Sequence, residues 1–353
     1  MLFCVIILIN LKRMGEQKMK LTNNLKKRFC KNYNIPIQIY EEPYWSSRIE
    51  LFDELFDTKV RLADFQKDLD TYIDEQDYFE QDNIFLQEII DDIRNSEGFQ
   101  FFNSTDNKDI LPNSADDIMR TMNYRRNDIY AETYKGKTFI SIDLKKANFQ
   151  SLKYFSCKFG KEIFQGKESW EEYLSLFTQE KTKINSKHLR QVIFGALNPS
   201  RVTNYEKKLM CELLIKILYE FPEWKEKVVS LNTDEIVIEI DNYNPNTWEF
   251  TSLTLMNTLN IIKQKLVEIC LEMGLYCEID VFVLEKLGKD VWKKVFVLNS
   301  STKNPYKKVS SLVYPFLLRE VKGEKIQEED KVFFYEGNKC MFLDNPYKKE
   351  VKE

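Results

Sequence analysis

The 353-residue chain is poor in the residues that build disulfide frameworks and zinc sites. Its seven cysteines are an odd number without a C-x-x-C pair, and its one histidine is His188. We therefore expect neither a disulfide scaffold nor a zinc site, and a reducing compartment fits best. Charged-group chemistry must run mainly on carboxylates, lysines, arginines and bound metal ions, and Cys157 and His188 are interpreted as structural residues.

The chain also lacks a strong net charge and a long apolar run. Its 52 basic and 56 acidic side chains give a formal charge of −4, which argues neither for nor against a polyanionic partner. The apolar opening, Met1 to Asn10, comes before its basic residues and is too short to span a bilayer. We interpret it as a buried strand or as an extension upstream of a start at Met14 or Met19, and we expect no membrane partner.

The composition favours a folded core, and the charges are unevenly distributed. Hydrophobic side chains make up 43% of the chain, enough for one substantial core or two modest ones, as in an enzyme-sized globular protein. From Arg48 to Arg94 there are 15 acidic and 5 basic residues, whereas from Lys181 to Lys216 there are 8 basic and 2 acidic residues. A phosphate backbone would be repelled by the first stretch and attracted by the second.

Hydrophobic periodicity predicts an α+β arrangement of helices and strands. Helices are expected over 48–95 (one or a pair), 115–122, 144–155, 169–177, 186–197, 205–220 and 255–273, and strands over 138–143, 228–231, 236–240, 276–284, 292–298, 331–335 and 340–343. Asn198-Pro199 is expected to end one helix and Gly274 another. Asp143 then lies at a strand-to-helix junction, and Asp234 lies at or beside the turn of a hairpin.

These two aspartates stand where a sheet could hold divalent metal ions. Phosphoryl transfer onto a growing chain uses two such ions, one at the attacking hydroxyl and one at the leaving pyrophosphate. Hard ions of this kind bind carboxylate oxygens. An aspartate at the end of a central strand and another on the adjacent hairpin would project from one rigid sheet, and Asp143 and Asp234 have these contexts.

Three segments resemble motifs of the family A nucleic-acid polymerases, the DNA polymerase I-like enzymes. The stretch from Asp143 to Ser156, preceded by a strand, is similar to the first palm motif, D-Y-S-Q-I-E-L-R followed by a helix. The stretch Arg190-Gln-Val-Ile-Phe-Gly-Ala-Leu-Asn198 resembles the fingers helix K-x-x-x-F-G-x-x-Y. The stretch Thr233-Asp-Glu-Ile-Val-Ile-Glu239 resembles the H-D-E hairpin. The order of the motifs agrees with the family across residues 136–300.

The sequence departs from the family's motifs at several positions. Arg190, with Lys187 close by, stands in place of the family's lysine and would give a forked contact with phosphate instead of a point charge. Asn198 replaces the tyrosine and Asn148 the glutamate that help DNA-making members to exclude a ribose hydroxyl, so the sugar selectivity is open. Thr233 replaces the histidine, and no motif of a proofreading nuclease is found.

The resemblance implies an α+β molecule with a polymerase-like palm, helical fingers and a helical thumb-like region. The expected bounds are 1–44 for an N-terminal segment, 45–130 for the acidic thumb-like region, 131–160 and 225–300 for the palm, 161–224 for basic fingers and 301–353 for a C-terminal region of short strands. The implied activity is template-directed nucleotidyl transfer, as by a DNA-directed DNA polymerase. The expected partners are a nucleic-acid primer-template, nucleoside triphosphates and an accessory protein subunit.

The resemblance also implies roles for single residues. Asp143 and Asp234 would hold two Mg²⁺ ions, with Mn²⁺ as the alternative metal and Glu235 as an auxiliary catalytic carboxylate. The nucleotide would be bound by five residues: Lys187 and Arg190 at the triphosphate, and Phe194, Asn198 and Asn148 in the pocket. The chain is rich in Asn, Lys, Ile and Phe, as expected from an AT-rich viral or phage genome, so the expected location is cytoplasmic, in the host cytoplasm or nucleoid.

Other hypotheses stay open. A reverse transcriptase or a single-subunit RNA polymerase would share the Asp143 motif and a later carboxylate hairpin, although helix-borne Arg190 and Phe194 favour family A. A palm without catalysis would serve as a nucleic-acid-binding or assembly subunit. A protein-binding module built on the acidic helices would have no affinity for polyanions at low salt. Taken singly, Asp143 is more simply a helix N-cap and Asp234 a solvated turn residue.

Overall fold

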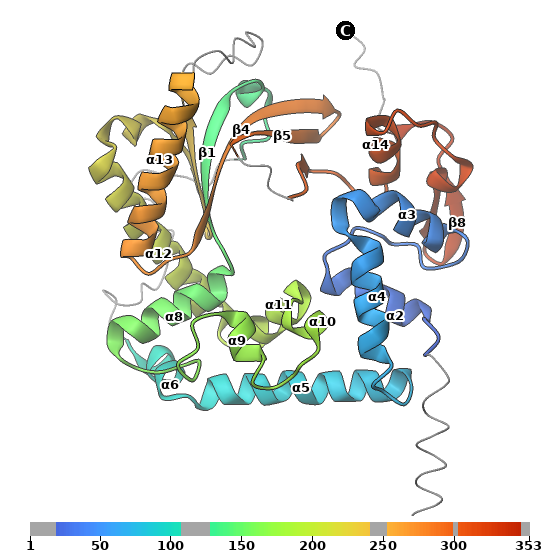
Figure 1. Cartoon of the computed structure of the whole chain (residues 1–353), viewed down its shortest axis with the longest axis horizontal. Helices are drawn as coiled ribbons and strands as arrows, with labels where there is room; N and C mark the ends of the chain where they lie inside the picture. Colours follow the sequence, from blue (N-terminus) through green and yellow to red (C-terminus); the bar gives the residue numbers. More distant parts are fainter. Residues whose placement is uncertain (1–18, 107–127, 241–252, 299–302, 347–353) are drawn as a thin grey trace, which may run out of the picture. The chain divides into compact units, whose positions relative to one another are not determined.

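The computed structural model describes residues 19–106, 128–240, 253–298 and 303–346, and the chain divides into two compact units (Figure 1). Unit 1 comprises Met1–Asp92, Ser169–Ile193 and Ser310–Pro346, and unit 2 comprises Ile93–Glu168, Phe194–Val309 and Tyr347–Glu353. The predicted 161–224 region contributes to both units, and the proposed bounds of palm, fingers and thumb stay a prediction. The apolar opening 1–10 and the expected helix 115–122 lie outside the described residues.

Unit 1 is mainly helical. Its helices are α2 (Asn23–Asn32), α3 (Tyr44–Phe56), α4 (Thr58–Leu69), most of α5 (Glu75–Asn95), α9 (Trp170–Leu174), α10 (Lys181–Ile184), most of α11 (Lys187–Ala196) and α14 (Tyr314–Val321), and β7 (Val332–Tyr335) pairs with β8 (Asn338–Met341). Aromatic side chains form much of its interior: Phe29 packs against Trp45 and Phe65, and Phe65 against Tyr78. All four are almost completely buried. The acidic helices predicted over 48–95 are therefore packing elements, as expected.

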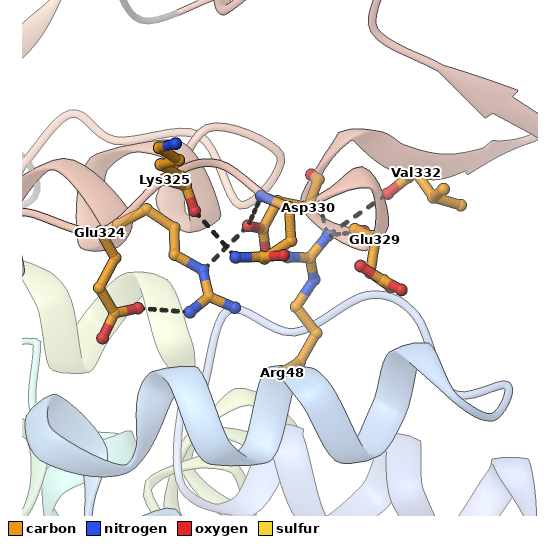
Figure 2. A network of polar contacts seen from close by, with 8 residues as sticks. Arg48, Glu324, Lys325, Glu329, Asp330 and Val332 are labelled. Atoms are coloured by element: carbon orange, nitrogen blue, oxygen red, sulfur yellow. Dashed lines mark hydrogen bonds and ion pairs between the residues drawn. The ribbon is translucent and has the colours of Figure 1, made fainter.

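A buried ion-pair network joins the first and the last sequence segments of unit 1 (Figure 2). The guanidinium of Arg48 on α3 donates to the Asp330 carboxylate at 3.0 Å and to the carbonyl oxygens of Glu329 and Asp330, also at 3.0 Å. Arg319 on α14 donates to the other carboxylate oxygen of Asp330 at 2.9 Å. Asp330 is 1% exposed, so its charge is compensated by two arginines instead of by water.

Unit 2 contains a six-stranded sheet in the order β2-β3-β1-β4-β5-β6, within the residues that the structure describes. The strands are β1 (Thr138–Leu144), β2 (Val228–Leu231), β3 (Glu235–Ile240), β4 (Cys277–Gly288), β5 (Val291–Leu298) and β6 (Tyr306–Lys307), and every pairing is antiparallel. Its helices are α6 (Glu97–Ser104), α8 (Ala147–Phe159), α12 (Pro199–Glu220) and α13 (Leu253–Glu272). The α+β class with an antiparallel sheet is thus confirmed at this level.

The sheet has one apolar face and one face that changes from apolar to charged. Ile140, Ile142 and Leu144 of β1 alternate with the residues of the other face and pack, with their β3 and β4 neighbours, against α12 and α13 (Figure 1). On the opposite face a smaller cluster gathers around Phe139 and Phe282. Because side chains alternate along a strand, the residues that follow on this second face are Ser141 and Asp143. Helices α12 and α13 pack on the apolar face, and polar side chains lie at the charged end of the second face.

Most predicted elements of unit 2 are confirmed with small shifts in their bounds. Gly274, at φ +69°, follows the end of α13 as expected for a helix-terminating glycine. The helix predicted over 205–220 is wrong at its start, because α12 already begins at Pro199. Asn198 is the N-cap of α12, its side-chain oxygen accepting a 3.4 Å hydrogen bond from the Arg201 amide, and Pro199 occupies the first turn.

Candidate active site

Three strands of unit 2 bring carboxylates into one row across the sheet. Asp143 near the end of β1 is directly opposite Glu235 at the start of β3 and directly opposite Glu278 on β4. Residues paired in this way on antiparallel strands project from the same face, with Cβ atoms about 5 Å apart. The row therefore lies on the polar face, at the end where β1 passes toward α8. This register agrees with the predicted placement of Asp143 on a strand beside the hairpin, whose second strand was predicted over 236–240 and begins at Glu235.

A second row on the same face adds another carboxylate. Ser141 of β1, two residues before Asp143, pairs with Asp280 of β4. Asp280 is only 3% exposed, so its charge needs a nearby cation. Lys303 supplies it: its Nζ lies 3.0 Å from Asp280, 2.5 Å from Glu278 and 3.8 Å from Asp143.

Asp234 lies in the turn between β2 and β3, beside this row. Its backbone carbonyl accepts a 2.7 Å hydrogen bond from the Leu144 amide, which ties the turn to the end of β1. The same turn is closed by a 2.8 Å bond from the Asn232 amide to the Glu235 carbonyl. The side chain of Asp234 is exposed, and its charge contributes to the electrostatic environment of Asp143. The two predicted aspartates are thus neighbours in the structure.

The environment of the site disfavours the ionised form of Asp143. Burial raises the pKa of Asp143 to about 6, and the neighbouring carboxylates of Glu235, Asp234 and Glu278 raise it too, whereas Lys303 opposes the shift. The Asp143 side chain nevertheless has 39% of its surface exposed, so a cation can reach it. A carboxylate of raised pKa among other carboxylates gains more from a bound cation than an isolated one does.

Two more lysines line the β5 and β6 side of the cluster. Lys294 on β5 is 7% exposed, with its Nζ 3.3 Å from Glu235 and 4.2 Å from the centre of the Phe282 ring. Burial lowers the pKa of Lys307 on β6, and the positive charges of Lys294 and Lys303 lower it further. The site is therefore a patch of alternating carboxylates and lysines, rather than a bare acidic cluster.

A pocket of about 290 Å³ lies beside Glu235 on the same face. It is lined by Asp128, Ile129, Tyr130, Ser230, Asn232, Glu235, Val237 and Lys308. The side-chain oxygen of Asn232 is buried without a hydrogen-bond partner among the described residues. The carboxylates of the pocket are paired with lysines, Asp128 with Lys308 at 2.8 Å and Glu235 with Lys294 at 3.3 Å, so the pocket presents both acceptors and cations to a ligand.

Asn148, predicted to bind nucleotide, contacts a carboxylate that the sequence analysis did not identify. Its side-chain amide donates a 2.6 Å hydrogen bond to Glu206 of α12. Glu206 is 3% exposed, and burial raises its pKa to about 7 while the bond from Asn148 and the charge of Asp234 act in opposite directions. A glutamate among the apolar residues of a helix was the available signal for this pair, since such a buried charge is rare.

The other predicted nucleotide-binding residues divide between the two units. Phe194 and Asn198 belong to unit 2: Phe194 is 3% exposed, so its ring is a core contact, and Asn198 caps α12 and donates to Asn103 at 3.1 Å. Lys187 and Arg190 belong to unit 1, with Lys187 exposed. Burial lowers the pKa of Arg190, the Glu171 carboxylate opposes this shift, and the Arg190 Nε is buried without a hydrogen-bond partner in the described structure.

The residues present fit a hard divalent cation in donor chemistry, although they are not gathered around one. Carboxylate oxygens from Asp143, Glu235 and Glu278 share a face, with Asp234 alongside, and such oxygens are the ligands that Mg²⁺ and Mn²⁺ prefer. Within the described ranges, however, no group of three or more His, Cys, Asp or Glu side chains is disposed to hold a metal ion. The centre of the cluster is occupied by the Lys303 ammonium instead.

Sequence reasoning missed Glu278, Asp280 and Lys303. The first two had a signal, because acidic residues at alternate positions of an otherwise apolar predicted strand must share one face. Lys303 had none, since it follows β5 in a loop whose path no periodicity defines.

Comparisons with known proteins give no assignment: no protein-family model, no curated protein and no solved structure matches the chain. None of the helices in the described part of the chain has the length and apolarity needed to cross a membrane.

Proposed function

We propose that the chain is a template-directed nucleotidyltransferase of the family A polymerase type. The observation that carries the proposal is the row of Glu235, Asp143 and Glu278 across three strands, with Asp234 in the turn beside it. The connectivity supports it as well: β1 leads through helices to the β2-β3 hairpin, and α13 leads from there to β4 on the other side of β1. The proposed palm is therefore the sheet of unit 2, with α12 and α13 behind it.

Each carboxylate has a proposed role that follows from its position. Asp143 and Asp234 would hold two Mg²⁺ or Mn²⁺ ions, and Glu235 would assist as an auxiliary ligand. Bound metal would activate the attacking hydroxyl and stabilise the charge that develops on the leaving pyrophosphate. Glu278 and Asp280 would keep the local potential negative and orient the neighbouring lysines. The polar pocket beside Glu235 would receive a hydroxyl-bearing part of the nucleic acid or nucleotide.

The contacts of the predicted nucleotide-binding residues change the roles that we propose for three of them. Lys187 and Arg190 would neutralise the triphosphate, as the fingers resemblance implies. Phe194 would shape the site from within the core, because its ring is buried. Asn198 would fix the start of α12, and Asn148 would act through Glu206. Both asparagines thus stand in hydrogen-bonded positions from which they would influence sugar selectivity.

Primer extension tests the proposal directly. A labelled DNA primer on DNA and RNA templates would be incubated with Mg²⁺ or Mn²⁺ and with deoxy- or ribonucleotides, using the wild type and Asp143→Asn. Loss of extension by at least about a hundredfold in the variant is expected, because electrostatic stabilisation of the transition state is lost. The matched control is Glu285→Gln, an equal change of charge at an exposed position of the neighbouring strand β4, which should extend normally. The template and sugar used would separate a DNA polymerase from a reverse transcriptase or an RNA polymerase.

A second function is favoured by the position of Lys303 at the centre of the carboxylates. A palm in which a lysine takes the place of the metal ions would bind nucleic acid or assemble with an accessory subunit, but it would not add nucleotides. This alternative predicts that the folded protein binds a primer-template equally well as wild type and as Asp143→Asn, with no extension under any combination of metal and nucleotide. Extension that requires Asp143 would exclude it.

A further inference from the structure

Lys303 contacts three carboxylates of the site with one ammonium group. It lies in the connection from β5 to β6, and its single ammonium group reaches Glu278, Asp280 and Asp143 at 2.5, 3.0 and 3.8 Å. These carboxylates come from two neighbouring strands of one sheet. Their separation and direction are fixed by the sheet, whereas the lysine reaches them from a loop.

The contacts of Lys303 compensate the buried charge of Asp280 and add to the pair that Glu278 forms with Lys145 at 3.6 Å. Asp280 is 3% exposed and Glu278 has its side chain 22% exposed, so water alone solvates neither fully. Burial lowers the pKa of Lys303, but its hydrogen bonds to Glu278 and Asp280 outweigh this, and the net pKa lies above the ordinary value. The lysine is therefore charged at neutral pH.

We propose that Lys303 is an exchangeable counter-ion of the metal site, which holds the carboxylates together when no metal is bound and is displaced when a divalent ion binds. The inference rests on the proposed function for the identity of the metal ligands. It adds a competition: a metal ion must replace one ammonium before it gains the contacts of the carboxylate row. The site then binds divalent ions more weakly than its number of carboxylates suggests.

The local structure allows this exchange with a movement of the side chain alone. The chain just beyond Lys303 is anchored, because the Lys294 amide donates to the Pro305 carbonyl at 2.9 Å and the Tyr306 amide to the Asn304 side chain at 3.0 Å. A lysine carries its charge on a flexible four-carbon stem, and its side chain here is 31% exposed. The ammonium can turn toward solvent while the backbone stays in place.

Titration calorimetry with Mn²⁺ on the full chain tests the competition. Lys303→Met should bind Mn²⁺ about tenfold or more tightly than the wild type, because a competing charge a few ångströms away is removed. Lys303→Arg should stay close to the wild type, since the charge is kept. The control is Lys137→Met, which removes an equal charge from a lysine that pairs with Glu239 at 2.8 Å, and which should change the affinity little.

Chemical labelling of the wild type gives a second readout that does not depend on a variant. Acetic anhydride should modify Lys303 slowly without metal and several-fold faster with saturating Mn²⁺, as measured by mass spectrometry, while Lys137, paired with Glu239, reacts at the same rate in both. Equal labelling rates at Lys303 would overturn the proposal, as would equal Mn²⁺ affinities of wild type and Lys303→Met, or no binding by either.

The outcomes separate this inference from the polymerase proposal. Tighter Mn²⁺ binding by Lys303→Met together with no primer extension by any protein would support the counter-ion role and reject the polymerase activity. Extension that requires Asp143, together with unchanged Mn²⁺ affinity and unchanged labelling, would reject the counter-ion role alone.

Discussion

At the scale of single residues, Asp143 is held where its own negative charge is unfavourable. Three carboxylates surround it, and burial adds to their effect on its pKa. Such an environment lowers the stability of the folded state, and unfavourable electrostatics of this kind are common at functional sites. The same environment makes the stability of the metal-free protein depend on pH.

We expect Asp143→Asn to raise the thermal stability of the metal-free protein above pH 7. Because the folded-state pKa of about 6 exceeds the ordinary value of 3.8, the folded state binds more protons between these values, and stability falls as pH rises through that window. The gain in melting temperature should be about 1 to 3 °C at pH 7.5, kept small by solvent exposure, and should vanish near pH 4. Scanning calorimetry in the presence of a chelator measures it, and a loss of stability at pH 7.5 would contradict it.

Glu206 is a second residue whose protonation should change the stability of the protein. Asn148→Ala removes the 2.6 Å hydrogen bond to a buried carboxyl whose pKa is about 7. The free energy of unfolding should fall by about 1–3 kcal/mol at pH 8, where Glu206 is charged, and by less at pH 6, where it is protonated. Urea unfolding at both pH values checks this. In a Glu206→Gln background the pH dependence of the Asn148→Ala effect should disappear, and its persistence would show that another group is responsible.

At the scale of elements, α6 is held against the 161–163 segment by a glycine. The Gly98 amide donates to the Glu162 carbonyl at 2.9 Å. A Cβ atom at Gly98 would overlap with the Lys161 carbonyl and the Ile163 side chain and lie 2.7 Å from the Glu162 carbonyl oxygen. Two of these three contacts are backbone carbonyl oxygens, which leave little room for adjustment, so the helix needs glycine for its close approach.

Gly98→Ala is therefore expected to destabilise unit 2 by about 1–3 kcal/mol or more. Gly195→Ala is the matched control: it lies within α11 with nothing within 4 Å of the added Cβ, so it should stabilise by up to about 1 kcal/mol. Urea unfolding of the two variants side by side measures both changes. Equal effects of the two substitutions would show that the packing at Gly98 is looser than the structure describes.

Elements were more predictable than contacts. The alternation in Thr138 to Asp143 and the helical spacing up to Gly274 predicted β1 and α13 closely, because local periodicity encodes a buried face. The start of α12 was placed too late, since Asn198-Pro199 both ends one helix and begins the next. The register that sets Asp143 opposite Glu278 joins residues far apart in the chain, and such pairing is decided by packing of the whole sheet.

At the scale of the whole molecule, Asp330 connects segments that lie at opposite ends of the sequence. Its carboxylate accepts from Arg48 on α3 and Arg319 on α14, and Arg48 is itself 5% exposed. Arg48→Met should destabilise unit 1 by about 3–5 kcal/mol, because a buried charge loses a partner. Lys331→Met, which breaks an exposed pair with Glu328, should cost less than about 0.5 kcal/mol.

Hydrogen exchange followed by mass spectrometry locates that loss. In Arg48→Met the peptides covering α3, α14 and β7 should exchange faster, while peptides of β1 and β4 in unit 2 keep their protection. Uniformly faster exchange in both units would instead show that the two units unfold as one.

The interleaving of the two units along the chain has a consequence for synthesis on the ribosome. Unit 1 begins the chain but is completed only by Ser310–Pro346, and unit 2 is interrupted by Ser169–Ile193. Neither unit can close its core before its later segments have been synthesised, so the nascent chain must keep the apolar faces of helices such as α3 exposed until then. We therefore expect this chain to need chaperones during its synthesis more than a protein built from consecutive domains does.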